Sequence, residues 1–129
     1  MSRVVTFGTY DMFHIGHLNM LERAKALGTY LAVGVSSDDL NIKKKGRMPI
    51  YSLKERIAIL RALRCVDEVF IEHSLEEKPK YCEGFDIFVI GDDWKGKFDY
   101  IKTSKLKVLY LPRTPEISTT ELIEKIKNR

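Results

Sequence analysis

Short apolar runs alternate along the chain with stretches of helical periodicity. Residues 3–7 and 30–36 are typical of strands, and the second run is nearly continuous in apolar residues, as expected for a strand covered on both faces. Between them, apolar residues recur on one helical face from about His17 to Leu27, and Gly28 is well placed to end that helix. The pattern therefore opens as strand, helix, strand.

The same alternation continues to the end of the chain. A capping box that begins at Ser52 predicts a helix ending near Arg64. A second box begins at Ser74, but Pro79 follows it and makes a long regular helix there unfavourable. The remaining strands are expected at 66–71, 85–91 and 107–111, and a third capping box, Ser118 with Glu121, predicts a terminal helix.

Strands that alternate with helices predict βαβ units and a parallel sheet. A length of 129 residues suits one domain, and no repeat, low-complexity tract or linker divides the chain. We therefore expect an α/β fold, a Rossmann-like open parallel sheet of five strands with helices on both faces, in a single domain over 1–129. Ligands of such sheets bind outside the carboxyl ends of the strands, where four polar loops are expected at 8–17, 36–47, 91–99 and 112–120.

Composition narrows the class of protein without deciding it. Hydrophobic residues make up 44% and charged residues 31%, as in ordinary globular proteins. No apolar run approaches the ~18 residues of a membrane span, and the first residues do not resemble a secretory signal. We therefore expect a cytoplasmic protein with no membrane partner. Cys65 and Cys82 lie in no paired motif, which favours two reduced thiols over zinc ligands or a disulfide.

The net charge of +4 favours anionic partners. The basic residues are scattered among acidic ones, and no aromatic-rich RNA-binding motif is present, so we do not expect nucleic acid as a partner. The densest basic run is Lys43 to Arg47. Such a short run is usually a solvated loop, although a lysine in it could meet a transferred phosphate.

The segment "GTYDMFHIGH", residues 8–17, places His14 and His17 three apart at the entry to a helix, so that both imidazoles can project to one side. Gly16 lets a ligand approach the backbone, and a helix N-terminus favours anions. Two imidazoles there could donate hydrogen bonds to phosphate oxygens, more strongly as charge develops. A purely structural turn is the alternative. The spacing favours a metal site less than a phosphate site, because no third soft ligand is near.

The segment "RTPEISTT", residues 113–120, offers a second set of groups that can donate hydrogen bonds to phosphate. Arg113 supplies a planar fork, and the hydroxyls of 118–120 lie beside free backbone N–H groups. A capped helix after a proline-rich turn is the structural alternative. Neither a P-loop nor G-x-G-x-x-G is present. After the fourth strand, Asp92 and Asp93 could accept hydrogen bonds from a base or ribose, help hold Mg²⁺, or simply be solvated.

These stretches contain no nucleophile–base pair of the Ser-His-Asp or Cys-His kind. They are rich in groups that can donate hydrogen bonds to phosphate. Phosphoryl-type transfer depends on such groups, because positioning and electrostatics perform most of the catalysis. The segments 8–17 and 113–120 together resemble the cytidylyltransferases, and the resemblance runs over essentially the whole chain. A lone H-x-G-H is less specific, since it also marks other nucleotidyltransferases and class I aminoacyl-tRNA synthetases.

The resemblance implies an enzyme that condenses CTP with a small phosphorylated alcohol, giving a CDP-alcohol and pyrophosphate. It also implies Mg²⁺ as a divalent cation, no organic cofactor, and a homodimer. Glycerol 3-phosphate is the expected acceptor. Phosphoethanolamine, phosphocholine or another polyol phosphate, and ATP in place of CTP, remain alternatives.

The resemblance also assigns roles to individual residues. His14, His17, Lys44 and Arg113 would be catalytic, and Lys44, Lys78 and Arg64 would bind the acceptor. Asp11 is a candidate metal ligand. Nucleotide binding would fall to Gly8, Thr9, Tyr10, His14, His17, Asp92, Arg113, Thr114, Ile117, Ser118, Thr119 and Thr120.

Two positions depart from the family pattern, and both lie on the acceptor side. Gly46 stands where a second lysine is frequent, with Lys45 and Arg47 beside it. Leu75 stands where a tryptophan is common. They bear on the identity of the acceptor more than on the use of CTP.

Overall fold

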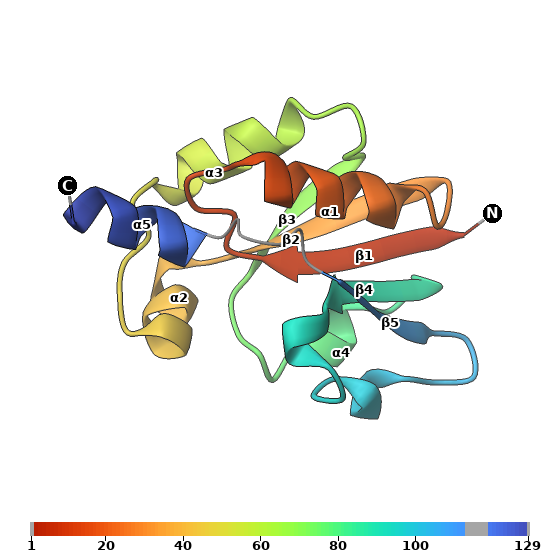
Figure 1. Ribbon diagram of the computed structural model, residues 1–129. Helices are drawn as coiled ribbons and strands as arrows, with labels where there is room; N and C mark the ends of the chain where they lie inside the picture. The colour runs from red at the N-terminus through yellow and green to blue at the C-terminus, as the bar shows by residue number, and fades with distance from the viewer. Residues whose placement is uncertain (1, 113–118, 129) are drawn as a thin grey trace.

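A computed structural model of the protein describes residues 2–112 and 119–128, with the backbone alone for 119–122. Its centre is one sheet of five strands, all parallel, in the order β3-β2-β1-β4-β5 (Figure 1). The predicted open parallel sheet is therefore confirmed. The strands are β1 (Arg3–Gly8), β2 (Tyr30–Ser36), β3 (Glu68–Glu72), β4 (Ile87–Gly91) and β5 (Lys107–Leu111).

Helices cover both faces of this sheet (Figure 1). On one face lie α1 and α3, and on the other lie α4 and the segment that carries the two short 3₁₀ turns. This arrangement agrees with the predicted α/β class. The elements are α1 (Ile15–Lys25), α2 (Asp38–Lys45), α3 (Leu53–Arg61), α4 (Lys78–Tyr81), α5 (Thr119–Lys127), η1 (Asp92–Trp94) and η2 (Asp99–Ile101).

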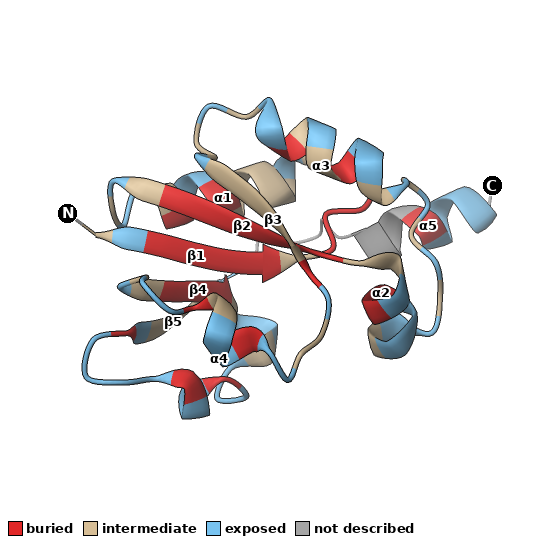
Figure 2. Cartoon of the chain, turned by 180° about the vertical axis from the view of Figure 1, so that it is seen from behind, coloured by how far each residue is buried: buried red, intermediate tan, exposed pale blue. Residues whose placement is uncertain are grey.

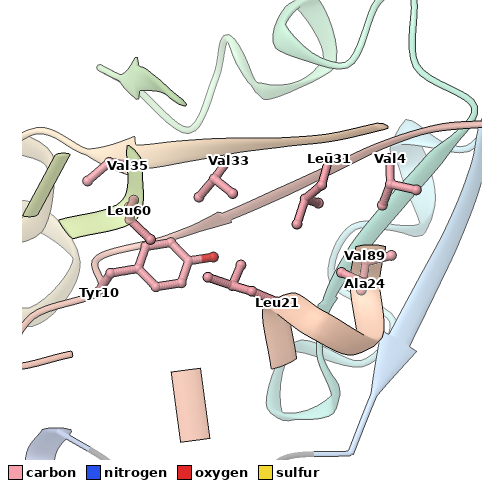
Figure 3. Packing of buried hydrophobic residues seen from close by; sticks show 9 residues of the cluster. All are labelled: Val4, Tyr10, Leu21, Ala24, Leu31, Val33, Val35, Leu60 and Val89. Carbon is pink, nitrogen blue, oxygen red and sulfur yellow. The ribbon is translucent and has the colours of Figure 1, made fainter. Parts of the chain in front are cut away.

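The central strands are buried on both faces (Figure 2), and because strand side chains alternate, they feed two separate cores. Toward α1 and α3 the sheet sends the aliphatic side chains shown in Figure 3, which pack against Leu21, Ala24 and Leu60. The opposite core is richer in aromatic rings, and it includes Phe7, Phe88 and Phe98. Because apolar side chains cover both faces of the sheet, the polar loops gather at its edge.

The prediction of a polar loop over 36–47, with a solvated basic run, was wrong, because α2 occupies most of it. Ser37 caps this helix, its Oγ accepting a hydrogen bond from the Leu40 N–H at 3.1 Å. Gly46 ends it with φ +71°, in the left-handed region. The three lysines at 43–45 thus form the last helical turn, where the helix dipole favours cations.

Other element boundaries shift by a few residues. The first helix begins at Ile15 instead of His17, because His14 is its cap. The helix predicted to end near Arg64 ends at Arg61. The short α4 fits the expectation that Pro79 prevents a long helix.

Both cysteines carry free thiols, as predicted. Burial raises the pKa of the Cys82 thiol to about 12, so this sulfur is held as an inert thiol in the core. Within the described part of the chain, no helix is both long enough and apolar enough to cross a membrane.

Gly34, in the middle of β2, provides a test of the packing. A Cβ at this position would lie 2.6 Å from an atom of the Phe7 ring and 2.9 Å from one of Phe70, closer than such contacts occur. We expect Gly34→Ala to lower the free energy of unfolding by about 1–3 kcal/mol, the usual cost of overpacking. Urea denaturation measures it, and an unchanged midpoint would show that the rings move aside freely.

Candidate active site

A cavity opens at the carboxyl edge of the sheet between β1 and β4, where the strand order reverses. Parallel sheets bind ligands at this switch point because two neighbouring loops diverge there. The first turn of α1 forms one wall, and η1 forms another. Its lining includes Gly8, Thr9, Tyr10, His14, His17 and Asp93, and we name it the first cavity.

The two histidines form the cap of α1. The Nδ1 of His14 accepts from the Gly16 N–H at 3.1 Å, and the Nδ1 of His17 accepts from the His14 N–H at 3.2 Å. This is a capping box in which histidines replace the usual Ser/Thr and Glu. A neutral imidazole that accepts at Nδ1 carries its proton at Nε2. Both rings therefore keep Nε2–H as a donor, and they stack with centroids 3.9 Å apart.

The turn before the cap is held in an unusual backbone conformation. Tyr10 and Met12 both have positive φ, at 55° and 47°, which costs free energy that surrounding contacts must offset. The Tyr10 ring is buried in the core, and burial raises the pKa of its hydroxyl above the usual value. A Cβ at Gly8 would lie 2.8 Å from this ring. Glycine there leaves room for the ring, which packs against the His17 ring in a T-shaped arrangement with centroids 5.6 Å apart.

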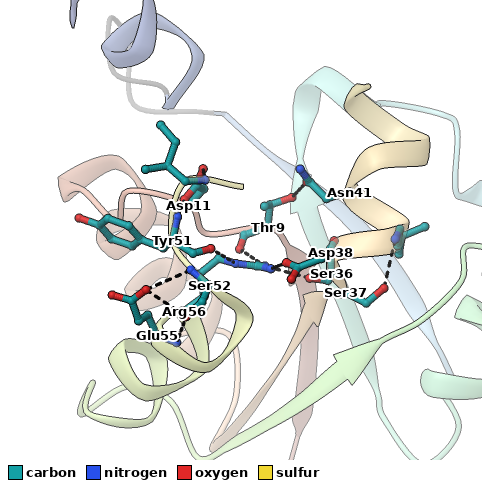
Figure 4. A network of polar contacts seen from close by, with 12 residues as sticks. Thr9, Asp11, Ser36, Ser37, Asp38, Asn41, Tyr51, Ser52, Glu55 and Arg56 are labelled. Carbon is teal, nitrogen blue, oxygen red and sulfur yellow. Dashed lines mark hydrogen bonds and ion pairs between the residues drawn. The ribbon is translucent and has the colours of Figure 1, made fainter. Parts of the chain in front are cut away.

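A fully buried guanidinium ties the loops of this edge together (Figure 4). Arg56 of α3 donates from Nη1 to the carbonyls of Thr9 at 3.0 Å and Ser36 at 2.8 Å. Its Nη2 pairs with Asp38 at 2.6 Å, and its Nε donates to the Tyr51 carbonyl at 3.2 Å. One side chain thus links the ends of β1 and β2, the start of α2 and the approach to α3.

Two further buried side chains complete this frame. The Asp11 carboxylate accepts the backbone N–H groups of 50–51 at 2.7 and 2.8 Å, one on each oxygen. Asn41 accepts from the Thr9 hydroxyl at 2.8 Å and donates to the Arg47 carbonyl at 3.0 Å. Asp11, the candidate metal ligand, therefore positions a loop. Among the described residues no group of three or more His, Cys, Asp or Glu could hold a metal ion.

A second cavity adjoins the first, and Gly8, Thr9, His17, Lys45 and Asp93 line both. Lys44 also lines it, with Nζ donating to the Ser36 hydroxyl at 2.6 Å. Burial lowers the pKa of the Lys44 ammonium to about 8, and the carboxylate of Glu72 partly offsets this. The cation is therefore held close to its titration range.

Lys78 lies at the floor of the second cavity, 2% exposed. Its ammonium is 2.5 Å from Oε2 of Glu72 and 3.9 Å from the centroid of the Phe7 ring. Burial lowers the pKa of Lys78, while the neighbouring Glu72 carboxylate acts in the opposite direction. A buried lysine of this kind keeps its charge only because a carboxylate and aromatic faces surround it.

The structure brings most of the predicted residues together, but not all. Gly8, Thr9, Tyr10 and both histidines meet in the first cavity, and Lys44 and Lys78 meet in the second. Asp93 lines both cavities, whereas Asp92 is not among the lining residues of either. Arg64 is exposed between α3 and β3, at the amino edge of the sheet and away from both cavities.

The second predicted phosphate cradle lies outside the described residues at Arg113, Thr114, Ile117 and Ser118. Thr119 and Thr120 begin α5, and their side chains are likewise outside the description. Arg23 of α1 donates to the Pro112 carbonyl at 2.6 Å. The helix that carries the histidines thus also holds the residue just before this segment.

Sequence reasoning missed Asn41, Arg56 and Glu72. Arg56 did leave a signal, because it shares the helical face of Leu53 and Leu60, where a charge is unexpected. Glu72 left a weaker signal, because an acidic residue here directly ends an apolar strand. Nothing local marked Asn41.

The parallel sheet and these paired cavities at its switch point, lined by hydrogen-bond donors and cations, fit a nucleotidyltransferase. More narrowly, the chain belongs to the cytidylyltransferase-like family, whose model matches residues 5–125. It is 46% identical over 128 residues to a glycerol-3-phosphate cytidylyltransferase of Bacillus subtilis (strain 168), covering 98% of each chain.

Other relatives agree with this assignment. A glycerol-3-phosphate cytidylyltransferase of Staphylococcus aureus is 41% identical over 128 residues, covering 98% of this chain and 96% of its own. Among solved structures, a lipopolysaccharide core biosynthesis protein from Thermoplasma volcanium superposes with a TM-score of 0.74 at 27% identity, covering 88% of this chain and 98% of its own.

Arg56 gives the sharpest test of how the site is held. We expect Arg56→Met to lower the free energy of unfolding by about 3 kcal/mol, the scale for breaking a buried charged network. The matched control is Arg61→Met on the exposed face of the same helix, with an expected change within about 0.5 kcal/mol. Urea denaturation of both variants decides it. Equal losses would contradict a structural role for the Arg56 guanidinium.

Proposed function

We propose that the protein is a glycerol-3-phosphate cytidylyltransferase, which joins CTP and glycerol 3-phosphate to give CDP-glycerol and pyrophosphate. The observation that carries the proposal is the pair of adjoining cavities, one with two imidazole donors and the other with the buried Lys78 and the half-buried Lys44. Each suits a phosphate-bearing ligand, and His17 lines both. The relatives at 41% and 46% identity carry the same activity in their names.

The reaction needs only one displacement. An oxygen of the acceptor phosphate attacks the α-phosphorus of CTP, and the bond from that phosphorus to the bridging oxygen of the β-phosphate breaks. Pyrophosphate leaves with the electron pair. We assign the first cavity to the triphosphate, where Nε2–H of His14 and His17 would donate to oxygens whose charge grows during the step. Lys44 and Lys78 would offset the charge of the acceptor phosphate.

The remaining nucleotide contacts are part of the proposal. Gly8 lets the ligand approach the end of β1 closely, while Thr9 and Tyr10 form the floor beside it. The family resemblance supports nucleotide contacts by Asp92 and by the segment 113–120. The acceptor contact by Arg64 stays a prediction from the family resemblance, since this residue lies at the opposite edge of the sheet from both cavities.

We also propose Mg²⁺ as the divalent cation. This ion usually takes one or two carboxylates together with substrate phosphates, which fits a site with few carboxylates. Asp93, which lines both cavities, is the residue we propose to hold it, with Asp11 already used for the 50–51 loop. When bound, the ion would neutralise charge on the triphosphate. A homodimer in the cytoplasm, without an organic cofactor, completes the proposal on the family resemblance.

The proposed activity predicts a specific product. Incubation with CTP, Mg²⁺ and glycerol 3-phosphate should release pyrophosphate and form CDP-glycerol, detected by mass spectrometry. ATP in place of CTP should give little product. Absence of pyrophosphate release with glycerol 3-phosphate and with every other small phosphorylated alcohol would refute the proposal.

The two nitrogens of His14 predict separable effects. His14→Asn keeps an acceptor for the helix cap and removes the Nε2–H donor, so kcat should fall ~10²-fold while stability is retained. His14→Ala removes both, and should also lose about 1 kcal/mol of unfolding free energy. Steady-state kinetics with thermal unfolding separates the two roles. A His14→Asn variant with full kcat would show that His14 takes no part in the chemistry.

Lys44 predicts an alkaline limb in the pH profile. Because its pKa is about 8 in the folded protein, the ammonium is lost as pH rises through 8, and kcat/KM for the acceptor should fall. Lys44→Arg keeps a charge that does not titrate in this range, so its profile should stay flat to higher pH. If kcat/KM falls with the same midpoint pH in both proteins, a group other than Lys44 is titrating.

A further inference from the structure

The carboxylate of Glu72 uses only one of its two oxygens in hydrogen bonds with the described residues. Glu72 ends β3, is fully buried and lines the second cavity. Its Oε2 holds the Lys78 ammonium. Its Oε1 is also buried, and within the described residues it has no hydrogen-bond partner. Buried acceptors nearly always have a donor, so this oxygen marks a position that a ligand can complete.

Within the described residues, no donor of the surrounding cluster bonds to Oε1. Ser36 lies opposite Glu72 in the β2–β3 ladder, and its hydroxyl accepts the Lys44 ammonium at 2.6 Å. Lys78 is placed by Oε2 and by the rings of Phe7 and Phe98, at 3.9 and 5.1 Å from their centroids. Oε1 is therefore left as an acceptor for a donor from outside this cluster.

The charges of the second cavity indicate what kind of donor fits. Among the described residues, three cationic side chains line it, Lys44, Lys45 and Lys78, against two acidic ones, Glu72 and Asp93. The negative charge of Glu72 is already balanced by Lys78. A hydroxyl can donate to Oε1 without adding another positive charge, whereas an ammonium group would add one to a cavity that is already cationic.

We propose that Glu72 selects the acceptor, with Oε1 accepting a hydrogen bond from a hydroxyl of the acceptor alcohol while Oε2 positions Lys78. The acceptor class is then a neutral polyol phosphate, and phosphorylated amino alcohols are disfavoured. This inference rests on the proposed cytidylyltransferase activity and extends it to the choice of acceptor.

The unmodified protein tests it first. The acceptors are glycerol 3-phosphate, its two analogues that each lack one hydroxyl (1,2-propanediol 1-phosphate and 3-hydroxypropyl phosphate), and phosphoethanolamine. A site built around a substrate hydroxyl rejects the analogue without it strongly. We expect kcat/KM to fall at least ~100-fold for one of the deoxy analogues and for phosphoethanolamine. Values within about threefold of glycerol 3-phosphate for both deoxy analogues, or preference for phosphoethanolamine, would overturn the inference.

The variant Glu72→Gln then tests the residue. An amide cannot offer the charge-assisted acceptor that a carboxylate does, so the preference for glycerol 3-phosphate over its rejected analogue should shrink at least ~10-fold, with KM for CTP unchanged. A merely structural role would reduce activity on both acceptors alike and leave their ratio intact, which would overturn the assignment. Glu68→Gln, on the same strand but at the amino edge and bonded to Tyr30, is the matched control.

The two levels of failure are distinguishable. Absence of CDP-glycerol from the unmodified protein would defeat the proposed function itself. Turnover of glycerol 3-phosphate without discrimination among the analogues would defeat only the role of Glu72. If Glu72→Gln does not fold, the acceptor series on the unmodified protein still decides the question.

Discussion

Burial of the Arg56 charge constrains four of the segments that surround the site. A guanidinium withdrawn from water is tolerated only where acceptors surround it, and here those acceptors come from four separate segments, at Thr9, Ser36, Asp38 and Tyr51. Since none of these segments can move without leaving a buried donor unpaired, the cavity edge is held in place before any ligand arrives. Preorganisation of this kind is what reactions driven by positioning require.

The histidine cap likewise serves both the structure and the proposed chemistry. Each imidazole uses Nδ1 to satisfy a backbone N–H at the start of α1, and this contact fixes both the ring and the position of its proton. The Nε2–H donors that we propose to face phosphate are therefore oriented by the folding of the helix. In the proposed mechanism, stability and chemistry use opposite nitrogens of the same two rings, which would account for a histidine at both positions.

Much of the fold could be predicted from sequence because buried parallel strands are nearly continuous apolar runs, as 30–36 and 107–111 illustrate. The basic helix α2 escaped prediction because it is short and mostly polar, so only its caps, Ser37 and Gly46, signalled it. The histidines were visible from local spacing. Arg56 and Glu72 left only weak signals, because their roles depend on partners that folding brings together. One partner of Arg56, the Thr9 carbonyl, lies 47 residues away.

The central claim is that this chain works by holding two phosphate-bearing ligands in line, with no group of its own entering a covalent bond. Both thiols lie outside the two cavities, and the lining offers donors and charge. The stereochemical course at phosphorus tests this most directly. With one diastereomer of CTP carrying sulfur at the α-phosphorus, a single displacement by glycerol 3-phosphate gives product of inverted configuration, as the account predicts. Retention would require two displacements through an enzyme-bound intermediate and would contradict it.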